Sequence, residues 1–132
     1  MNLIFRILAG LVGLAMGLSG VRWIIDPAGS AAGLGMPLLE DMGASTQIGD
    51  FAAFFLAIGV FVAVAQRRGA SRWLLAAALL LGLAATMRTL AFAFGHAPFG
   101  AIPIAAEVVM ATILVTSARL RAGSEDAPAT DG

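Results

Sequence analysis

Residues 73–94 read WLLAAALLLGLAATMRTLAFAF, an apolar run that holds one charged residue, Arg88. As an α-helix, a run of this length crosses the roughly 30 Å of hydrocarbon in a bilayer. Three more runs of this kind lie at residues 7–25, 48–65 and 102–118, and the last is only just long enough. The four runs predict an all-α membrane protein built as an antiparallel four-helix transmembrane bundle.

The composition of the chain points the same way. Of its 132 residues, 60% are hydrophobic and 12% are charged, and the mean hydropathy is +0.94. This leaves too little polar surface to cover a soluble globule. The basic residues are all arginine and the formal net charge is zero, so no cationic face is available for nucleic acid. Cysteine is absent, which excludes disulfides, thiol catalysis and cysteine-ligated clusters.

Arginine placement predicts the orientation of the spans. Six of the 8 arginines fall on one side of the four runs, at positions 6, 67, 68, 72, 119 and 121. By the positive-inside rule this side is cytoplasmic, so we expect a multi-pass protein of the cell inner membrane with both termini in the cytoplasm. Arg6 before the first run resembles the start of a signal peptide. The apolar stretch continues through Ile25, however, and exceeds a usual h-region, which favours a retained helix.

The connection between the first two runs, residues 26–47, is the longest. Its uncharged first part, residues 27–39, predicts a short interfacial segment on the outer surface. Two roles stay open for this segment: a lid over a functional site, or a cap over the outer end of the bundle. We expect residues 1–118 to form the transmembrane domain. Residues 119–132 are expected to form a disordered cytoplasmic tail, because that stretch is rich in Gly, Ser, Pro and acids.

Each apolar run holds one ionisable residue, and the helical rise places Arg22, Asp50, Arg88 and Glu107 within roughly 10 Å of the outer boundary. Charges inside membrane helices are costly, so they usually pair within the protein or mark a binding site or pathway. Arg88 and Glu107 are predicted to touch, because the short turn at residues 95–100 joins their helices. Asp50 either shares Arg88 or caps its helix, and Arg22 either joins this layer or extends to the headgroups.

Small residues and charge placement also predict how the helices pack. The first run has one smooth stripe against which another backbone can approach closely, formed by Gly10, Gly13, Gly17 and Gly20. The two halves of the chain share one order of helices and charges, so that Arg22 corresponds to Arg88 and Asp50 to Glu107. Such an order indicates a parallel repeat about an axis along the membrane normal.

Several short motifs carry a resemblance. They are Asp26-Pro27, the loop GLGMP at residues 33–37, GDF at 49–51, MRTL at 87–90 and AEV at 106–108. In their order the chain resembles a family of small bacterial four-span proteins of unknown function, similar in layout to DoxX-like proteins. The resemblance covers about residues 3–120 and implies Asp50, Arg88 and Glu107 as site residues. It also implies a link to quinone-dependent oxidation.

Three classes of function stay open. A non-catalytic accessory subunit, or a binder of a small molecule or lipid, fits the small size and the lack of a catalytic motif; its partner would be membrane lipid, a membrane protein or a second copy of the chain. A small transporter or proton-coupled carrier would use Arg88 and Glu107. A quinone- or lipid-linked enzyme rests on the resemblance alone.

We expect no cofactor and no metal site. His96 is the single histidine of the chain and lies alone in an outer turn. One imidazole is a poor basis for a metal site, which needs several ligands. Because histidine titrates near neutral pH, His96 is instead a candidate pH-sensitive group.

Overall fold

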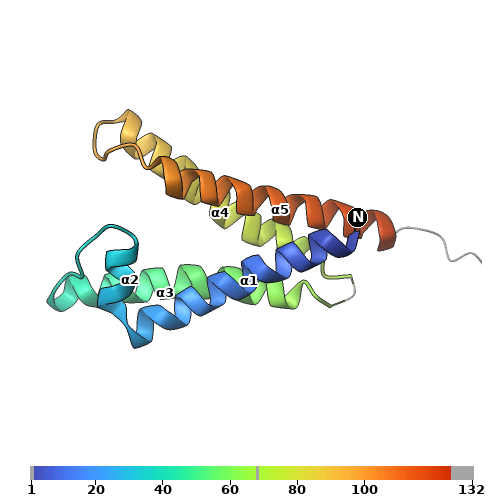
Figure 1. The fold of residues 1–132 in the computed structure, drawn as a ribbon, viewed down its shortest axis with the longest axis horizontal. Helices are drawn as coiled ribbons and strands as arrows, with labels where there is room; N and C mark the ends of the chain where they lie inside the picture. Colours follow the sequence, from blue (N-terminus) through green and yellow to red (C-terminus); the bar gives the residue numbers. More distant parts are fainter. Residues whose placement is uncertain (1, 68, 126–132) are drawn as a thin grey trace, which may run out of the picture.

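The computed structural model describes residues 2–67 and 69–125, and these form five helices (Figure 1). The helices are α1 (Asn2–Ile25), α2 (Pro27–Gly33), α3 (Asp41–Val64), α4 (Arg72–Ala93) and α5 (Ala101–Glu125). All but α2 are long and apolar enough to cross a membrane. The predicted all-helical bundle of four spans, with a short segment between the first two, is confirmed.

The third helix begins earlier than its apolar run. α3 starts at Asp41 rather than at residue 48, directly after Glu40, whose backbone is extended (φ −108°, ψ 161°). Hydropathy does not mark the first turns of α3, because they contain mainly polar and small residues. Asp50 therefore lies well inside α3, where backbone N–H groups already bond within the helix. The predicted role of Asp50 as a helix cap is wrong.

The last helix ends later than its apolar run. α5 continues to Glu125, past the predicted end of the transmembrane domain at residue 118. Arg121 accounts for the ordered extension, because its guanidinium donates to the backbone oxygen of Ala65 at 2.7 Å and to Oε1 of Gln66 at 3.0 Å. The predicted tail thus begins as helix, and its remainder, residues 126–132, lies outside the described residues.

The four long helices form two antiparallel hairpins, α1 with α3 and α4 with α5 (Figure 1). The first hairpin is close-packed at its glycines. A Cβ atom added to Gly59 would lie 2.8 Å from Cα of Gly17, and one added to Gly13 would lie 2.5 Å from Cγ1 of Val62. Gly20 also faces α3, whereas a Cβ on Gly10 would meet nothing within 4 Å. Most of the predicted glycine stripe therefore packs within this hairpin.

The two hairpins share a core in one half of the molecule. This half, the arginine-rich end, contains the start of α1, the end of α3, the start of α4 and the end of α5, with Arg6, Arg67, Arg72, Arg119 and Arg121. Buried side chains from all four long helices meet there, among them Val12, Ile58, Leu81 and Leu114. The described ends of the chain also lie at this end (Figure 1).

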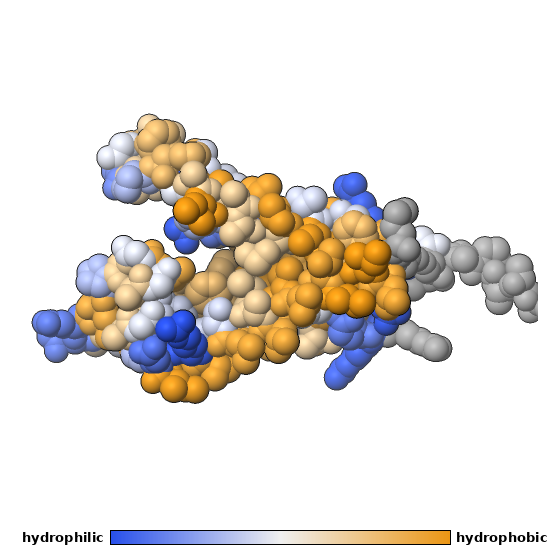
Figure 2. Space-filling model, viewed as in Figure 1, coloured by the Kyte–Doolittle hydropathy of each residue, from blue (hydrophilic) through white to orange (hydrophobic). Residues whose placement is uncertain are grey.

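The opposite half, the α2 end, has a separate small core. Its buried residues are Trp23, Ala31 and Ala52, from α1, α2 and α3. The ring of Trp23 stacks on that of Phe51, with centroids 4.8 Å apart and planes 9° apart. None of the described residues of α4 or α5 belongs to this cluster. The hairpins therefore diverge toward the α2 end, and Figure 2 shows the resulting hollow between two lobes of the surface.

Candidate functional site

Arg88 of α4 and Glu107 of α5 form a buried ion pair. The Nε of Arg88 donates to Oε1 of Glu107 at 2.9 Å. The Glu107 side chain is 9% exposed and that of Arg88 is 39% exposed. Because α4 and α5 run antiparallel from a short turn, residues at similar distances from that turn meet at one depth. The predicted direct contact between Arg88 and Glu107 is confirmed.

The ion pair leaves hydrogen-bonding capacity unused on both residues. Oε2 of Glu107 is buried and has no hydrogen-bond partner in the described structure. Arg88 bonds to Glu107 through Nε, and no described residue accepts a hydrogen bond from its two terminal Nη groups. A buried oxygen that lacks a donor costs about 1–3 kcal/mol, more if it is charged. Of these groups, the Arg88 guanidinium is the one that a ligand can reach, because the Arg88 side chain is 39% exposed whereas Oε2 of Glu107 is buried.

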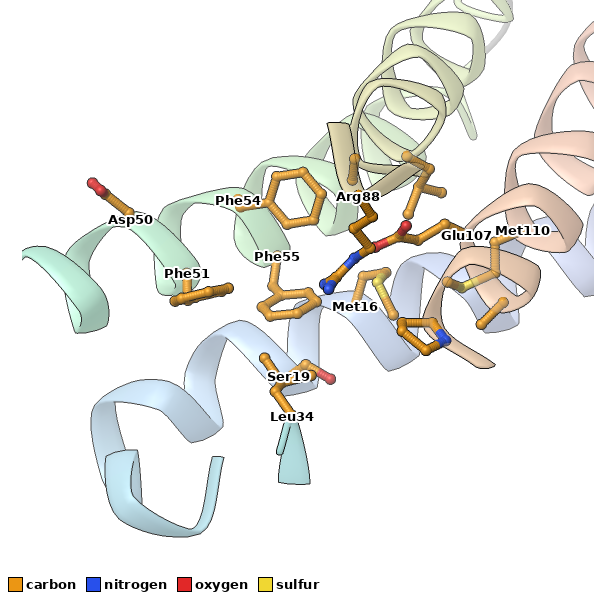
Figure 3. Close-up of a pocket in the computed structure, with 14 residues that line it drawn as sticks. Met16, Ser19, Leu34, Asp50, Phe51, Phe54, Phe55, Arg88, Glu107 and Met110 are labelled. Atoms are coloured by element: carbon orange, nitrogen blue, oxygen red, sulfur yellow. The ribbon is translucent and has the colours of Figure 1, made fainter. Parts of the chain in front are cut away.

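A cavity of about 530 Å³ adjoins the ion pair, where the two hairpins diverge. All four long helices line it, and Leu34 adds a contact from the segment after α2. The walls are mainly apolar and include Met16, Phe54 and Phe55. Figure 3 shows the Arg88 guanidinium extending from α4 toward Phe55 and Met16. A cavity of roughly 300–1,000 Å³ with apolar walls and few polar groups is typical of small-molecule sites.

Asp50 borders the same cavity but does not join the ion pair. Its side chain is exposed. Asp50 forms no ion pair with another described residue, and Figure 3 shows the Asp50 carboxylate pointing away from Arg88. The expected contact between Asp50 and Arg88 is not formed. Glu107 is the acid that Arg88 contacts.

Arg22 pairs locally and stays outside the Arg88–Glu107 site. Its Nη2 lies 3.4 Å from Oδ2 of Asp26, and the two side chains are 61% and 52% exposed. Oδ1 of Asp26 also accepts a hydrogen bond from the backbone N–H of Gly29 at 2.9 Å and so caps α2. This N–H bond, with Arg22 as a second cause, lowers the pKa of Asp26. Arg22 and Arg88 thus make different contacts, although they correspond in the predicted repeat.

Gln47 fixes the segment that follows α2. Its side chain is buried, its Oε1 accepts from the backbone N–H of Leu39 at 2.8 Å, and its Nε2 donates to the backbone oxygen of Pro37 at 3.1 Å. These bonds hold the segment against α3, with Leu34 at the cavity edge. The apolar-run pattern did not mark Gln47, since it stands just before the run. A long polar side chain at that boundary was the available signal.

His96 lies in the exposed turn between α4 and α5, with its ring centroid 6.4 Å from that of Phe94. Its sensitivity to pH stays a prediction. Within residues 2–67 and 69–125, no group of three His, Cys, Asp or Glu side chains could hold a metal ion.

No protein-family model matches the chain, and neither the curated proteins nor the solved structures contain a significant match. The resemblance to DoxX-like proteins therefore stays a prediction. The geometry of the cavity and its ion pair is the basis on which a function can be assigned.

Proposed function

We propose that this protein binds an amphipathic small molecule or lipid between its two hairpins, within the membrane. The observation that carries the proposal is an ion pair with a nine-tenths-buried acid, Glu107, on the wall of an otherwise apolar cavity of about 530 Å³. Aromatic and methionine side chains would contact the apolar body of the ligand. Arg88, held by Glu107, would contact its polar end.

The surroundings of the cavity explain why polar contacts would decide selectivity. In a bilayer, lipid tails are as apolar as the cavity walls, so moving an apolar chain from lipid into protein gains little hydrophobic free energy. A hydrogen bond made away from bulk water is electrostatically stronger than one made in it. A ligand would therefore be chosen by its polar end and tolerated over a range of chain lengths.

Two substitutions of alanine by phenylalanine test whether the cavity is the binding site. Ala84 of α4 lines the cavity, whereas Ala53 of α3 is exposed on the helix surface. The wild-type protein and Ala53→Phe, purified from membranes in mild detergent, should retain an amphiphile in near-stoichiometric amount, identified by extraction and mass spectrometry. Ala84→Phe should lose most of it. Equal amounts of ordinary membrane lipid on all three proteins would contradict the proposal. So would a co-purifying membrane protein whose removal leaves no amphiphile behind.

The orientation in the membrane is a second part of the proposal. The cluster of arginines at one end favours a cytoplasmic location for that end, with both termini inside an inner membrane. Reporter fusions in the turn at residues 67–71 and at the C-terminus should read cytoplasmic, and a fusion beside Glu40 should read external. An external C-terminus would overturn this orientation.

A proton-coupled carrier is the second candidate, favoured by one observation: the hairpins share a core at the arginine-rich end and diverge at the α2 end. Such a molecule can rock one hairpin against the other around a central site. Reconstituted in liposomes, a carrier would move the amphiphile found in purification faster under a pH gradient, and Glu107→Gln would abolish the gradient dependence. Binding without movement would leave the binder as the function.

A further inference from the structure

The polar atoms that a ligand can reach from the cavity lie on Arg88. Its two Nη groups donate to no described residue, and neither is among the buried polar atoms without a partner. The Arg88 side chain is 39% exposed and lines the cavity, with its guanidinium extending toward Met16 and Phe55 (Figure 3). Because a guanidinium can donate hydrogen bonds but cannot accept them, the polar end of a ligand must present an acceptor to Arg88.

Glu107 holds this guanidinium on the side of Nε and does not offer its free oxygen to a ligand. Its Oε1 accepts from Nε of Arg88 at 2.9 Å, whereas its Oε2 is buried. A hydrogen bond between two charged groups is short and directional, so it fixes how the guanidinium lies. The acid thus orients Arg88 and cancels its formal charge, and it leaves the two Nη groups for the ligand.

The charged residues on the cavity wall carry a net negative charge. Arg88 is the single base among them, and Glu107 and Asp50 are two acids, so the formal sum is −1. An anionic head would lose its solvation and meet a guanidinium whose charge Glu107 already cancels. A cationic head would meet donors at Arg88, and the exposed Asp50 carboxylate, which points away from Arg88, is screened by its surroundings (Figure 3). Neither kind of charged head finds compensation beside Arg88.

We propose that the cavity binds a neutral amphiphile through a carbonyl oxygen on its polar end, the chemistry of a fatty ketone or ester, and that Glu107 disfavours anions by cancelling the charge of Arg88. This inference rests on the proposed binding function and assigns the chemical class of its ligand. A carbonyl oxygen accepts from the Nη groups and brings no hydrogen of its own. A hydroxyl would also accept, but it brings a hydrogen that the buried Oε2 of Glu107 cannot take.

Four probes with one alkyl chain test the proposal: a methyl ketone, the hydrocarbon in which CH₂ replaces its carbonyl, a sulfonate and a trimethylammonium. Each carries the same diazirine near the end of its chain and is irradiated with the protein in nanodiscs of a diether phosphatidylcholine, a lipid without ester carbonyls. Labelling is counted by intact mass and mapped to peptides. Ala84→Phe gives the baseline for probe dissolved in the lipid, and Ala53→Phe is the matched control.

The ketone should label the peptides of the cavity above this baseline. It should reach half-maximal labelling at about a tenth of the concentration that the hydrocarbon needs, because a hydrogen bond to a charged group contributes about this factor or more. Both charged probes should need at least about tenfold more than the ketone, since their heads lose solvation without compensation.

Three variants assign the parts of this preference. Arg88→Leu combined with Glu107→Leu removes the donor without leaving an unpaired charge, so it should bind the ketone no better than the hydrocarbon. Glu107→Gln keeps an oxygen for Nε of Arg88 but removes the cancelling charge, so the sulfonate should gain on the ketone. Asp50→Asn removes an acid that points away from Arg88 and should shift the sulfonate less. A folded double variant that keeps the ketone preference would overturn the role of Arg88. If a variant does not fold, the wild-type series decides alone.

The outcomes separate the head-group inference from the binding function. If the wild type binds a charged probe or the hydrocarbon as strongly as the ketone, the head-group inference is overturned and the binder stands. The same holds if no probe exceeds the baseline while the purified protein still carries its own amphiphile in a manner sensitive to Ala84→Phe. If no probe labels the cavity and no amphiphile is retained, both proposals fail.

Discussion

The first hairpin, α1 with α3, is held by direct backbone approach, whereas the second, α4 with α5, carries an ion pair in the half where the hairpins separate. In the first, Gly17 and Gly59 approach so closely that a side chain at Gly59 has no room without displacement. In the second, Arg88 and Glu107 meet at 2.9 Å beside a cavity. Helices of similar hydropathy can thus pack through contacts that differ in how many hydrogen-bonding groups they leave free.

The difference lies in what each contact leaves unsatisfied. Close packing at glycines consists of many small dispersion contacts and has no spare hydrogen-bonding groups. The ion pair satisfies charge but leaves Oε2 of Glu107 without a donor. Arg88 bonds through Nε and is 39% exposed, so of the two hairpins the second is the one that offers polar groups to a ligand. The first supplies a rigid wall.

Removal of Arg88 should have the largest effect on stability. Arg88→Leu leaves the carboxylate of Glu107 buried and unpaired, which should lower the free energy of unfolding by about 3–5 kcal/mol. Glu107→Leu should cost less, since Arg88 is 39% exposed and retains access to its surroundings. The double variant should recover most of the loss. Reversible unfolding in mixed micelles measures all three, and a double variant as unstable as Arg88→Leu would show that the pair is not the cause.

Loss of the glycine contact should have the next largest effect and should act on the other hairpin. Gly59→Ala places a methyl group 2.8 Å from Cα of Gly17, so the helices must separate, at a cost of about 1–3 kcal/mol. Gly10→Ala is the matched control, because a Cβ there meets nothing within 4 Å. It should be neutral or stabilise by up to about 1 kcal/mol through helix propensity. Equal effects of the two substitutions in the same unfolding assay would show that the close contact at Gly59 does not stabilise the first hairpin.

Gln47→Leu should weaken only the α2 end of the first hairpin. The leucine has a side chain of similar volume. It leaves the backbone N–H of Leu39 without its acceptor, at a cost of about 1 kcal/mol. Amide hydrogen exchange should accelerate at Leu39 while α4 and α5 keep their protection. Acceleration across the second hairpin would mean that the two hairpins are coupled at this end, contrary to the separate cores.

The smallest expected effect is that of pH on α2. The pKa of Asp26 is lowered from its ordinary 3.8, first by the N–H of Gly29 and then by Arg22. The pKa is lowered because the fold stabilises the ionised carboxylate. The resulting contribution to folding stability is complete above the ordinary pKa and is lost as the pH falls through the folded-state value. Amide protection in α2, corrected for the intrinsic exchange rate, should drop in that acidic range. Asp26→Asn retains a capping side chain and should remove the pH dependence.

The depth of each charged residue was predictable, and its direction was not. Residue spacing from a short turn placed Arg88 beside Glu107, because connectivity alone fixes that match. It could not show that Asp50 points away from Arg88, since the direction around α3 depends on packing. The sequence did contain a sign of the Arg22 contact, although residue depth does not include it. Asp26 follows Arg22 by four residues, the spacing of neighbours on one helix face.

The cavity could not be predicted from the four runs. Hydropathy along α4 and α5 does not mark where the hairpins part, because a side chain that faces lipid can be as apolar as one that faces the core. The cause is a geometric one. Side chains as far along as Leu81 and Leu114 meet the other hairpin in the shared core, and the next buried cluster belongs to the first hairpin with α2 alone.

Arg121 joins the two hairpins at the arginine-rich end, and this contact fixes the point about which one hairpin would rotate against the other. The guanidinium binds Ala65 and Gln66 from the far hairpin and so pins the two arms at one end. From Ala65 to Asp50 the arm is roughly 22 Å long at 1.5 Å per residue. A rotation of about 5° at the pin would then move the tip by about 2 Å, with little change in the pinned contacts. A substitution at Arg121, far from the cavity, should therefore alter how widely its mouth opens.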